Sequence, residues 1–272
     1  MTSPIAVETG MATHAGLRRA LNEDSFLAAS PVFMVADGMG GHEAGDRASS
    51  AVIDELRPLV ERASIGVDDV RAAIGRARAR INALSEQGSG RAGTTLSGVA
   101  IAAVDGNGYW LTVNIGDSRT YRWAGGELEQ ITVDHSVVQE LIDAGQLRSS
   151  DAQRDHRRNI ITRALGAGSS GETDYWMIPA AAADRILVCS DGLTSEVPDA
   201  IIAEVLRDNR DPQSAADQLI DCALQQGGRD NITAIVIDAL RVSSRRGDIV
   251  SFDSDGLDIQ TRPRAEAIGG RP

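Results

Sequence analysis

The chain of 272 residues contains no lysine, so all 27 of its basic residues are arginine. This absence excludes every mechanism that depends on a lysine, including the lysine-containing phosphate-binding loop. Aromatic residues make up only 3% of the chain, so its core must be built from alanine, valine, isoleucine and leucine. The net charge of −12 disfavours nucleic acid as a main partner, because such binding needs a basic surface.

Cysteine and long apolar runs are also scarce. The two cysteines, Cys189 and Cys222, form neither a spaced metal-binding motif nor a disulfide framework. The N-terminus has no continuous apolar signal segment, and no run approaches the roughly 18 apolar residues of a membrane span. We therefore expect a cytoplasmic, monomeric protein with neither a membrane nor a nucleic-acid partner.

Apolar runs bounded by turn residues predict seven strands. They cover residues 25–29, 32–36, 95–104, 109–115, 119–123, 185–190 and 232–239. Glycine-containing connections at 105–108 and 124–126 join neighbouring runs and predict hairpins. Strands joined by tight turns indicate antiparallel sheets, because parallel neighbours need long crossovers.

Helical periodicity follows in several blocks. Apolar stripes run over residues 48–60 and 70–84, and further helices are predicted at 137–144, 199–207 and 212–226. Strands and helix pairs in this order predict an α+β fold with helices outside two packed sheets. The pattern dissolves near Ser243, so we predict one catalytic domain over residues 1–241 and a disordered tail over 242–272.

Carboxylates occur where apolar strands begin or end. Asp37 and Asp191 each follow a strand and precede a glycine, and the other such positions are Asp117, Asp230 and the pair Glu23 and Asp24. Antiparallel sheets could bring these strand ends together, where unpaired carboxylates would repel one another. A divalent cation removes that conflict. Oxygen ligands without histidine or cysteine favour Mg²⁺ or Mn²⁺ over zinc.

A pair of such ions sharing a bridging aspartate would activate a water for in-line attack on a phosphate ester. The phosphate oxygens would then need a cation that does not titrate. Arg18 or Arg19, just before Glu23, could supply a bidentate guanidinium.

Eight short motifs occur along the chain in a definite order. They are GLRRALNEDS (16–25), DGMGGHEAG (37–45), GTTL (93–96), NIGDSR (114–119), DHS (134–136), ITRALG (161–166), SDGL (190–193) and GRDNIT (228–233). In content and order they resemble the motifs of the type 2C metal-dependent protein serine/threonine phosphatases, the PPM family, in their bacterial single-domain form. The resemblance covers residues 13 to 240.

This resemblance implies a central sandwich of two antiparallel β-sheets flanked by α-helices, in four layers, with a metal centre at one edge. The implied activity is metal-dependent hydrolysis of phosphoserine and phosphothreonine in proteins that a serine/threonine kinase has phosphorylated. Residues 134–163 correspond to a flap that helps to define substrate access.

The resemblance also implies a role for each candidate site residue. Arg19, and not Arg18, matches the arginine that binds the substrate phosphate. Two Mn²⁺ or Mg²⁺ ions would be bound by Asp37 as the bridging ligand, by Asp191 and Asp230 at one ion, and by Glu23 or Asp24 with the carbonyl of Gly38 at the other. Asp117 would join Asp191 in holding a third, weaker ion.

One position departs from the family pattern. Animal members have a histidine directly after the Asp-Gly pair, where it is proposed to protonate the leaving group, whereas this chain has Met39. His42 lies three residues further on, so the sequence leaves the general acid unassigned. His135 and His156 are expected to shape the flap.

Three alternatives compete with this interpretation. A nucleotide-binding ATPase is disfavoured, because residues 88–95 have Thr94 in place of the essential lysine and precede a strand instead of a helix. A catalytically inactive phosphatase-fold binding protein would be expected to lack Asp37, Asp191 or Asp230, and all three are present. The same chemistry on a different phosphoester stays open, because no residue pattern identifies the substrate.

Overall fold

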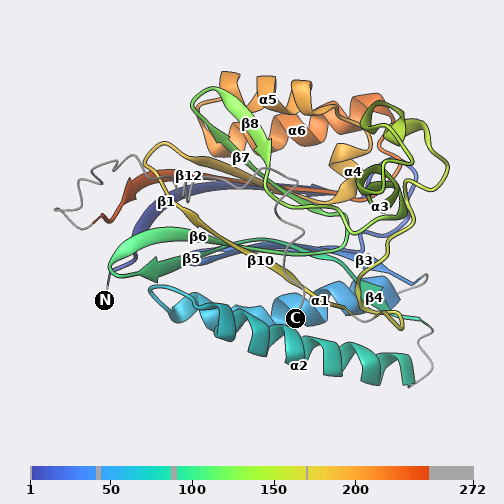
Figure 1. The fold of residues 1–272 in the computed structure, drawn as a ribbon, viewed down its shortest axis with the longest axis horizontal. Helices are drawn as coiled ribbons and strands as arrows, with labels where there is room; N and C mark the ends of the chain where they lie inside the picture. The colour runs from blue at the N-terminus through green and yellow to red at the C-terminus, as the bar shows by residue number, and fades with distance from the viewer. Residues whose placement is uncertain (1, 41–43, 87–90, 170, 245–272) are drawn as a thin grey trace.

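The computed structural model describes residues 2–40, 44–86, 91–169 and 171–244. Two antiparallel sheets packed face to face form the centre of the molecule (Figure 1). The five-stranded sheet has the order β1 (Ile5–His14), β12 (Ile232–Val242), β11 (Arg185–Cys189), β7 (Arg119–Ala124) and β8 (Glu127–Gln130). The seven-stranded sheet has the order β10 (Asp174–Pro179), β6 (Asn107–Ile115), β5 (Leu96–Val104), β3 (Val32–Met39), β4 (Gly93–Thr94) and β9 (Leu165–Gly166), and β2 (Asp24–Ala29) pairs with β3.

Helices cover the outer face of each sheet (Figure 1). The seven-stranded sheet is covered by α1 (Ala44–Leu56) and α2 (Val67–Glu86), which the 3₁₀ turn η1 (Arg57–Glu61) separates. The five-stranded sheet is covered by α4 (Asp191–Thr194), α5 (Asp199–Asp208) and α6 (Pro212–Gln226). The predicted four-layer α+β sandwich is therefore confirmed.

Three apolar clusters fill the spaces between these layers. The cluster between the two sheets contains Phe33, Trp110 and Ile186, while the outer clusters lie beneath the helices. Strand alternation explains the division: Ile186 and Val188 face the other sheet, and Leu187 and Cys189 face α5 and α6. Each large apolar side chain buried in this way contributes roughly 1.5–3 kcal/mol to folding.

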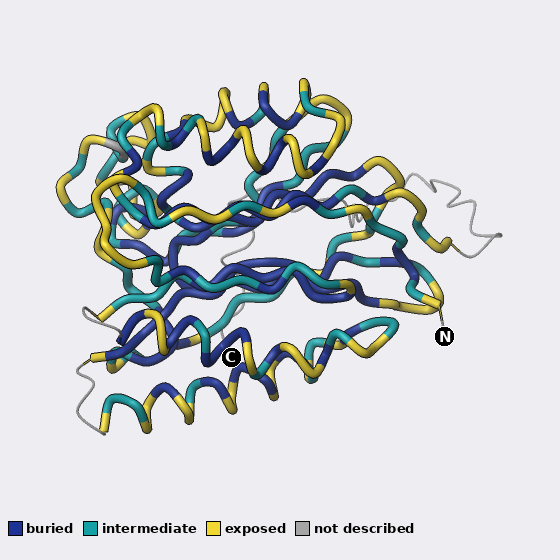
Figure 2. Tube along the Cα trace, turned by 180° about the vertical axis from the view of Figure 1, so that it is seen from behind, coloured by how far each residue is buried: buried dark blue, intermediate teal, exposed yellow. Residues whose placement is uncertain are grey.

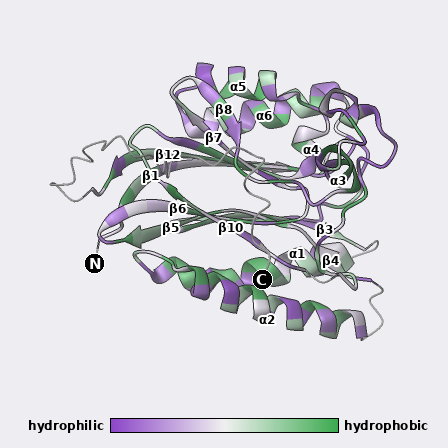
Figure 3. Cartoon of the chain, in the orientation of Figure 1, coloured by the Kyte–Doolittle hydropathy of each residue, from purple (hydrophilic) through white to green (hydrophobic). Residues whose placement is uncertain are grey.

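Burial and hydropathy follow the same layers. The central strands are mostly buried along their length, while the helices alternate between buried and exposed residues (Figure 2). Figure 3 shows the corresponding hydrophobic and hydrophilic faces of α2, α5 and α6. The helices are therefore amphipathic covers for sheets that are apolar on both faces.

All seven predicted strands are present, as are the two predicted hairpins β5–β6 and β7–β8. The sequence patterns missed β1 and β10, which are edge strands with many exposed or half-exposed residues. They also missed β8, the two-residue strands β4 and β9, and α4. Edge strands bury only part of their surface, so they lack the strong apolar pattern on which strand prediction depends.

The boundaries of two elements near the site differ from the prediction. The strand predicted to end at Ala36 continues to Met39, because Gly38 and Met39 pair with β4. β12 continues to Val242, one residue past the predicted domain end, and residues 245–272 of the predicted tail lie outside the described residues. None of the helices in the described ranges has the length and apolarity needed to cross a membrane.

Candidate metal centre

A cleft of about 270 Å³ opens at the edge of the sandwich where β3, β6 and β11 end and β2 and β12 begin. The residues that line it are Arg19, Glu23, Asp37, Gly38, Met39, Gly40, Asp117, Asn159, Ile161, Asp191, Asp230 and Asn231. Of the predicted site residues, only Asp24 is missing from this lining. The fold therefore brings five carboxylates and one arginine from distant parts of the sequence to one place.

The backbone of Asp37 is fixed by two threonines of the GTTL motif. Its N–H donates to Thr95 Oγ1 at 3.0 Å, and its carbonyl accepts from Thr94 Oγ1 at 2.8 Å and from the Thr95 N–H at 2.9 Å. Thr95 Oγ1 also hydrogen-bonds Ser118 Oγ at 2.7 Å. These contacts hold the predicted bridging residue rigidly and connect it to the turn that carries Asp117.

Asp24 lies directly opposite Asp37 in the antiparallel pairing of β2 with β3. It is 8% exposed, and its Oδ2 accepts hydrogen bonds from Ser190 Oγ at 2.8 Å and Thr233 Oγ1 at 2.7 Å. Ser190 precedes Asp191, and Thr233 lies near the start of β12. Asp24 therefore joins the two sheets beneath the cleft instead of lining it.

Asp191 and Asp230 are brought together by close backbone packing. Asp191 begins α4, and a Cβ on the following Gly192 would lie 1.9 Å from the carbonyl oxygen of Asn231. Only glycine permits this approach. Asp230 forms an ion pair with Arg19, whose Nη2 lies 2.7 Å from Oδ2, so the candidate phosphate-binding residue lies beside a candidate metal ligand.

Asn231 fixes the loop that carries Arg19 and Glu23. Its Oδ1 accepts from the Glu23 N–H at 2.8 Å, and its Nδ2 donates to the carbonyls of Ala15 at 3.0 Å and Leu21 at 2.8 Å. The side chain is 4% exposed. One buried amide therefore holds both ends of the loop against the start of β12.

Glu23 packs against the first turn of α1. A Cβ at Gly45 would lie 2.5 Å from Glu23 Oε1, and Ser49 Oγ donates to the Glu23 carbonyl at 2.6 Å. The Gly38 N–H donates to the same carbonyl at 3.2 Å. The absence of a side chain at Gly45 thus makes room for the Glu23 carboxylate at the cleft.

Asp117 lies in the turn between β6 and β7 and is 7% exposed. The preceding Gly116 has a φ of +106°, a conformation that favours glycine. Its N–H donates to His135 Nδ1 at 3.1 Å, and its carbonyl accepts from the His135 N–H at 2.8 Å. His135 therefore holds the turn on which Asp117 lies.

Burial and mutual repulsion raise the pKa values of the grouped carboxyls. Burial raises the pKa of Asp37 well above its usual range, and Asp24, Asp191, Asp117 and Asp230 raise it further. Burial also raises the pKa of Asp24 to about 7, against the lowering effect of its hydrogen bonds from Thr233 and Ser190.

The same causes act on the carboxyls across the cleft. Burial and then Asp191 raise the pKa of Asp117 well above its usual range. Burial and then Asp230 raise the pKa of Asp191, while a hydrogen bond from Asp37 lowers it. Because a divalent cation stabilises the charged carboxylates, these shifts indicate a cation site and do not identify a proton donor.

Unpaired oxygens provide an independent test of whether a cation fits. Glu23 Oε1, Asp24 Oδ1 and Asp117 Oδ1 are buried without a hydrogen-bond partner. Such atoms are costly unless something satisfies them, and a set of hard carboxylate oxygens suits Mn²⁺ or Mg²⁺. The donor set therefore fits the expected ions.

The carboxylates do not yet form a complete ligand set. In their present conformations, the described residues contain no group of three or more carboxylate, histidine or cysteine side chains arranged so that they could hold an ion. The convergence on one cleft and the three unpaired oxygens are the stronger evidence, because carboxylate rotation is inexpensive compared with moving strands. Binding would require these side chains to turn toward a shared point.

The segment predicted to form a flap, residues 134–163, contributes Asn159 and Ile161 to the cleft. Within it lie α3 (Val137–Asp143) and the 3₁₀ turn η2 (Ser149–Arg154). His135 at its start is 5% exposed, and its Nε2 lies 3.0 Å from Asp174 Oδ2. His135 therefore holds the start of this segment, while His156 is an exposed residue within it.

The proton donor is not identified by the described residues. Met39 lines the cleft. It occupies the sequence position, directly after Asp37 and Gly38, at which animal members of the type 2C family have a histidine. None of the histidines within the described ranges lines the cleft, and His42 lies outside those ranges.

Sequence reasoning missed several residues of the site. Asn159, Ile161 and Asn231 line the cleft, and Thr94 and Thr95 hold Asp37. The motifs GTTL, ITRALG and GRDNIT contain four of these five residues, but motif membership alone gave none of them a physical role. Their roles depend on contacts between segments that lie far apart in the sequence.

Comparisons with known proteins agree with this geometry. The family model described as protein phosphatase 2C matches residues 16–236. The serine/threonine phosphatase stp of Listeria innocua serovar 6a is 36% identical over 76% of this chain and 84% of its own length.

Solved structures give the same result. The serine/threonine phosphatase PstP/Ppp of Mycobacterium tuberculosis matches with a TM-score of 0.80 and 38% identity, covering 86% of this chain and 99% of that structure. A structure of the catalytic domain of PstP in complex with two manganese ions matches with a TM-score of 0.77 and 37% identity, covering 86% and 99% of the two chains.

Proposed function

This chain belongs to the protein phosphatase 2C family and is a metal-dependent protein serine/threonine phosphatase of the Mn/Mg type, and we propose that the cleft is its binuclear metal centre. In this proposal two ions would be held with Asp37 as the ligand that they share. Asp191 and Asp230 would bind one ion, and Glu23 with the carbonyl of Gly38 would bind the other. Asp24 would support the second site without lining the cleft, because its Oδ2 already accepts hydrogen bonds from Ser190 and Thr233.

One observation carries the proposal: five carboxylates line a single cleft, and Glu23 and Asp117 each keep a buried oxygen without a hydrogen-bond partner. Carboxylates packed this closely raise one another's pKa values, which is costly unless cations are shared among them. When bound, two Mn²⁺ or Mg²⁺ ions would supply an activated water between them for attack on phosphorus. Asp117 and Asp191 could hold a third, weaker ion.

Arg19 is proposed to bind the substrate phosphate. Its described contact with Asp230 uses only Nη2, so the remaining guanidinium donors can reach phosphate oxygens. The pair is also exposed, with 52% of the Arg19 side chain and 37% of the Asp230 side chain accessible. Such a pair contributes at most about 1 kcal/mol, so Asp230 can exchange its partner for a cation at small cost.

The proposed substrates are phosphoserine and phosphothreonine proteins produced by a serine/threonine kinase. Such substrates arise where ATP-dependent kinases act, which favours a cytoplasmic role in signal transduction. The described fold forms its cleft from one chain alone, in accord with a monomer. Identification of the substrate proteins would indicate which kinase phosphorylates them.

Hydrolysis of a phosphothreonine peptide after exhaustive chelation and re-addition of Mn²⁺ tests the function. We expect phosphate release only with Mn²⁺ or Mg²⁺ and its loss with EDTA, with the matched phosphotyrosine peptide as the control. Hydrolysis that persisted without metal would contradict the binuclear centre. Hydrolysis of small phosphoesters but not of the peptide would favour a different phosphoester, and Mn²⁺ binding without any hydrolysis would favour a binding protein.

A further inference from the structure

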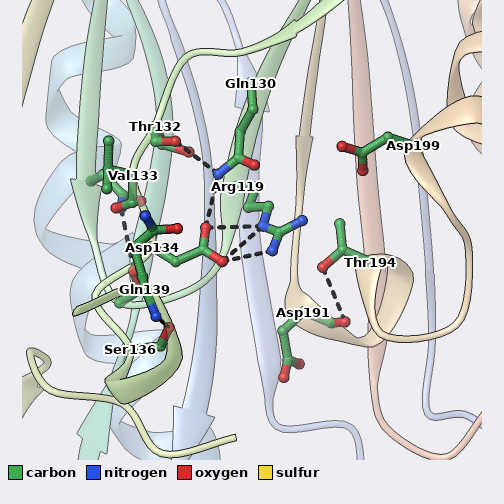
Figure 4. A network of polar contacts seen from close by, with 12 residues as sticks. Arg119, Gln130, Thr132, Val133, Asp134, Ser136, Gln139, Asp191, Thr194 and Asp199 are labelled. Atoms are coloured by element: carbon green, nitrogen blue, oxygen red, sulfur yellow. Dashed lines mark hydrogen bonds and ion pairs between the residues drawn. The ribbon is translucent and has the colours of Figure 1, made fainter. Parts of the chain in front are cut away.

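A partly buried ion pair connects the start of the proposed flap to the strand that follows Asp117. Arg119 Nη2 lies 2.6 Å from Asp134 Oδ2, and Arg119 Nε lies 2.9 Å and 3.0 Å from the two Asp134 oxygens. Figure 4 shows the guanidinium facing the Asp134 carboxylate, which also accepts from Gln130 Nε2 at 2.8 Å. The Arg119 and Asp134 side chains are 25% and 11% exposed. The ion pair, in which two guanidinium nitrogens contact the carboxylate, is therefore largely shielded from solvent.

Arg119 lies next to both ligands of the proposed third-ion site. It follows Asp117 by two residues, and it pairs with Cys189 in the β7–β11 register, two residues before Asp191. By binding Asp134, the Arg119 guanidinium therefore fixes the start of the flap relative to the backbone at both Asp117 and Asp191.

A second contact holds the same turn from its other side. His135, the next flap residue, exchanges two hydrogen bonds with Gly116, at 2.8 Å and 3.1 Å. Asp117 thus lies between two anchors of the flap, Gly116 before it and Arg119 after it. Displacement of residues 134 and 135 would break these contacts with the turn that carries Asp117.

The anchored start also determines where the far end of the flap lies. The His135 carbonyl accepts from the Thr162 N–H at 2.8 Å, and Ser136 forms an isolated β-bridge with Ile161. Ile161 lines the cleft. One continuous set of contacts therefore runs from the Arg119–Asp134 pair to a side chain that lines the cleft.

We propose that Arg119 and Asp134 are positioning residues that couple the flap to the ion site formed by Asp117 and Asp191. The coupling rests on the proposed metal centre and adds a link between that centre and substrate access. Because coupling between two sites is reciprocal, ion binding should restrain the flap, and loss of the link should weaken ion binding.

Direct Mn²⁺ binding by calorimetry, together with kcat and KM for the phosphothreonine peptide, tests this link in Arg119→Gln, Asp134→Asn and the double variant. We expect each single variant to lower the Mn²⁺ affinity of the weakest site by roughly 10- to 100-fold, as for other groups that orient metal ligands. The KM for the peptide should rise as well. The double variant should be no worse than the singles, because both residues act through one contact.

Arg122→Gln is the matched control. Arg122 lies three residues further along β7 and forms an equally close buried pair with Asp184, at 2.7 Å. The Arg122→Gln variant should have a lower unfolding temperature, with unchanged Mn²⁺ affinity and KM. If Arg119→Gln behaved in the same way, its role would be structural only and the proposal would be wrong.

A purely electrostatic role is also distinguishable. Removing the positive charge of Arg119 would then tighten Mn²⁺ binding, whereas removing the negative charge of Asp134 would weaken it. Opposite signs for the two variants would overturn the positional coupling. Weaker Mn²⁺ binding in both variants would support the positional coupling.

Hydrogen exchange of residues 134–163 provides a readout that is independent of activity. We expect Mn²⁺ to slow exchange in the parent and in Arg122→Gln but not in Arg119→Gln. Equal slowing in Arg119→Gln would overturn the coupling alone. A parent that bound no Mn²⁺ would instead overturn the proposed metal centre on which it rests.

Discussion

Nη2 of Arg19 lies 2.7 Å from Oδ2 of Asp230, so the candidate phosphate ligand and a candidate metal ligand are in direct contact. The hydrogen bond that Arg19 donates to Asp230 and the negative charge of that carboxylate raise the pKa of Arg19, against the lowering effect of burial. Arg19 therefore stays charged, as a phosphate-binding residue must. The contact also explains how the β1–β2 loop is held near the start of β12.

Replacement of Arg19 by alanine should mainly raise KM. The guanidinium contacts phosphate in the ground state, so its loss should raise KM for the phosphothreonine peptide by about 10-fold and change kcat less. Steady-state kinetics under saturating Mn²⁺ measure both constants. Arg18→Ala is the matched control, because Arg18 is an exposed neighbour that does not line the cleft. An unchanged KM in Arg19→Ala with a raised KM in Arg18→Ala would reverse the assignment.

Asp37→Asn and Asp191→Asn should abolish turnover but leave the fold intact. Each removes a proposed metal ligand, so kcat should fall by at least about 100-fold. Each also removes repulsion between buried carboxylates, so thermal unfolding in EDTA should occur at or above the parent temperature. Circular dichroism melting checks the second expectation. A variant that was unfolded in EDTA while the parent stayed folded would contradict this account.

Without metal, the free energy of unfolding should fall as pH rises. The pKa of Asp24 rises from 3.8 in the unfolded chain to about 7 in the folded chain, so the native state holds a proton between these values that the unfolded state has lost. In EDTA, Asp24 alone should therefore lower the free energy of unfolding by about 2 kcal/mol from pH 5.5 to pH 8. The unfolding temperature would fall by roughly 5 °C.

Mn²⁺ competes with protons for the same oxygens, so its stabilising effect should grow as pH rises. Thermal melts at pH 5.5 and pH 8, with Mn²⁺ and with EDTA, measure both trends. Asp24→Asn should make the EDTA profile less steep, because it removes one of the buried carboxyls whose pKa is raised. A parent whose EDTA profile already rose over this range would show that Asp24 is not protonated as expected.

Asn231→Ala should reduce both stability and substrate affinity. It removes three hydrogen bonds, to the Glu23 N–H and to the carbonyls of Ala15 and Leu21, at a cost of about 3 kcal/mol. KM should rise as well, because these bonds hold the loop that carries Arg19. In Asn209→Ala, which removes a side-chain bond to Val205 at the end of α5, we expect lower stability with unchanged KM. If KM stayed at the parent value in Asn231→Ala, the loop would not need this support.

The sequence predicted the central elements well and the edges of the sheets poorly. Residues 185–190 and 232–239 are strongly apolar and lie in the middle of the five-stranded sheet as β11 and β12. β1 pairs with β12 over its whole length but buries only Ile5 and Gly10. The backbone pairing that makes β1 a strand leaves little trace in its side chains.

The sequence by itself determined which chemistry this protein can perform. Without lysine, and with aspartates where strands begin or end, a cation site was the consistent interpretation, and the ordered motifs identified the family. Only the tertiary structure decided which groups meet. Asp24 faces Asp37 across two strands, Asn231 holds a loop more than 200 positions away, and Arg119 binds the flap through Asp134. These relationships arise from strand pairing and close backbone packing, and no local pattern of residue types encodes them.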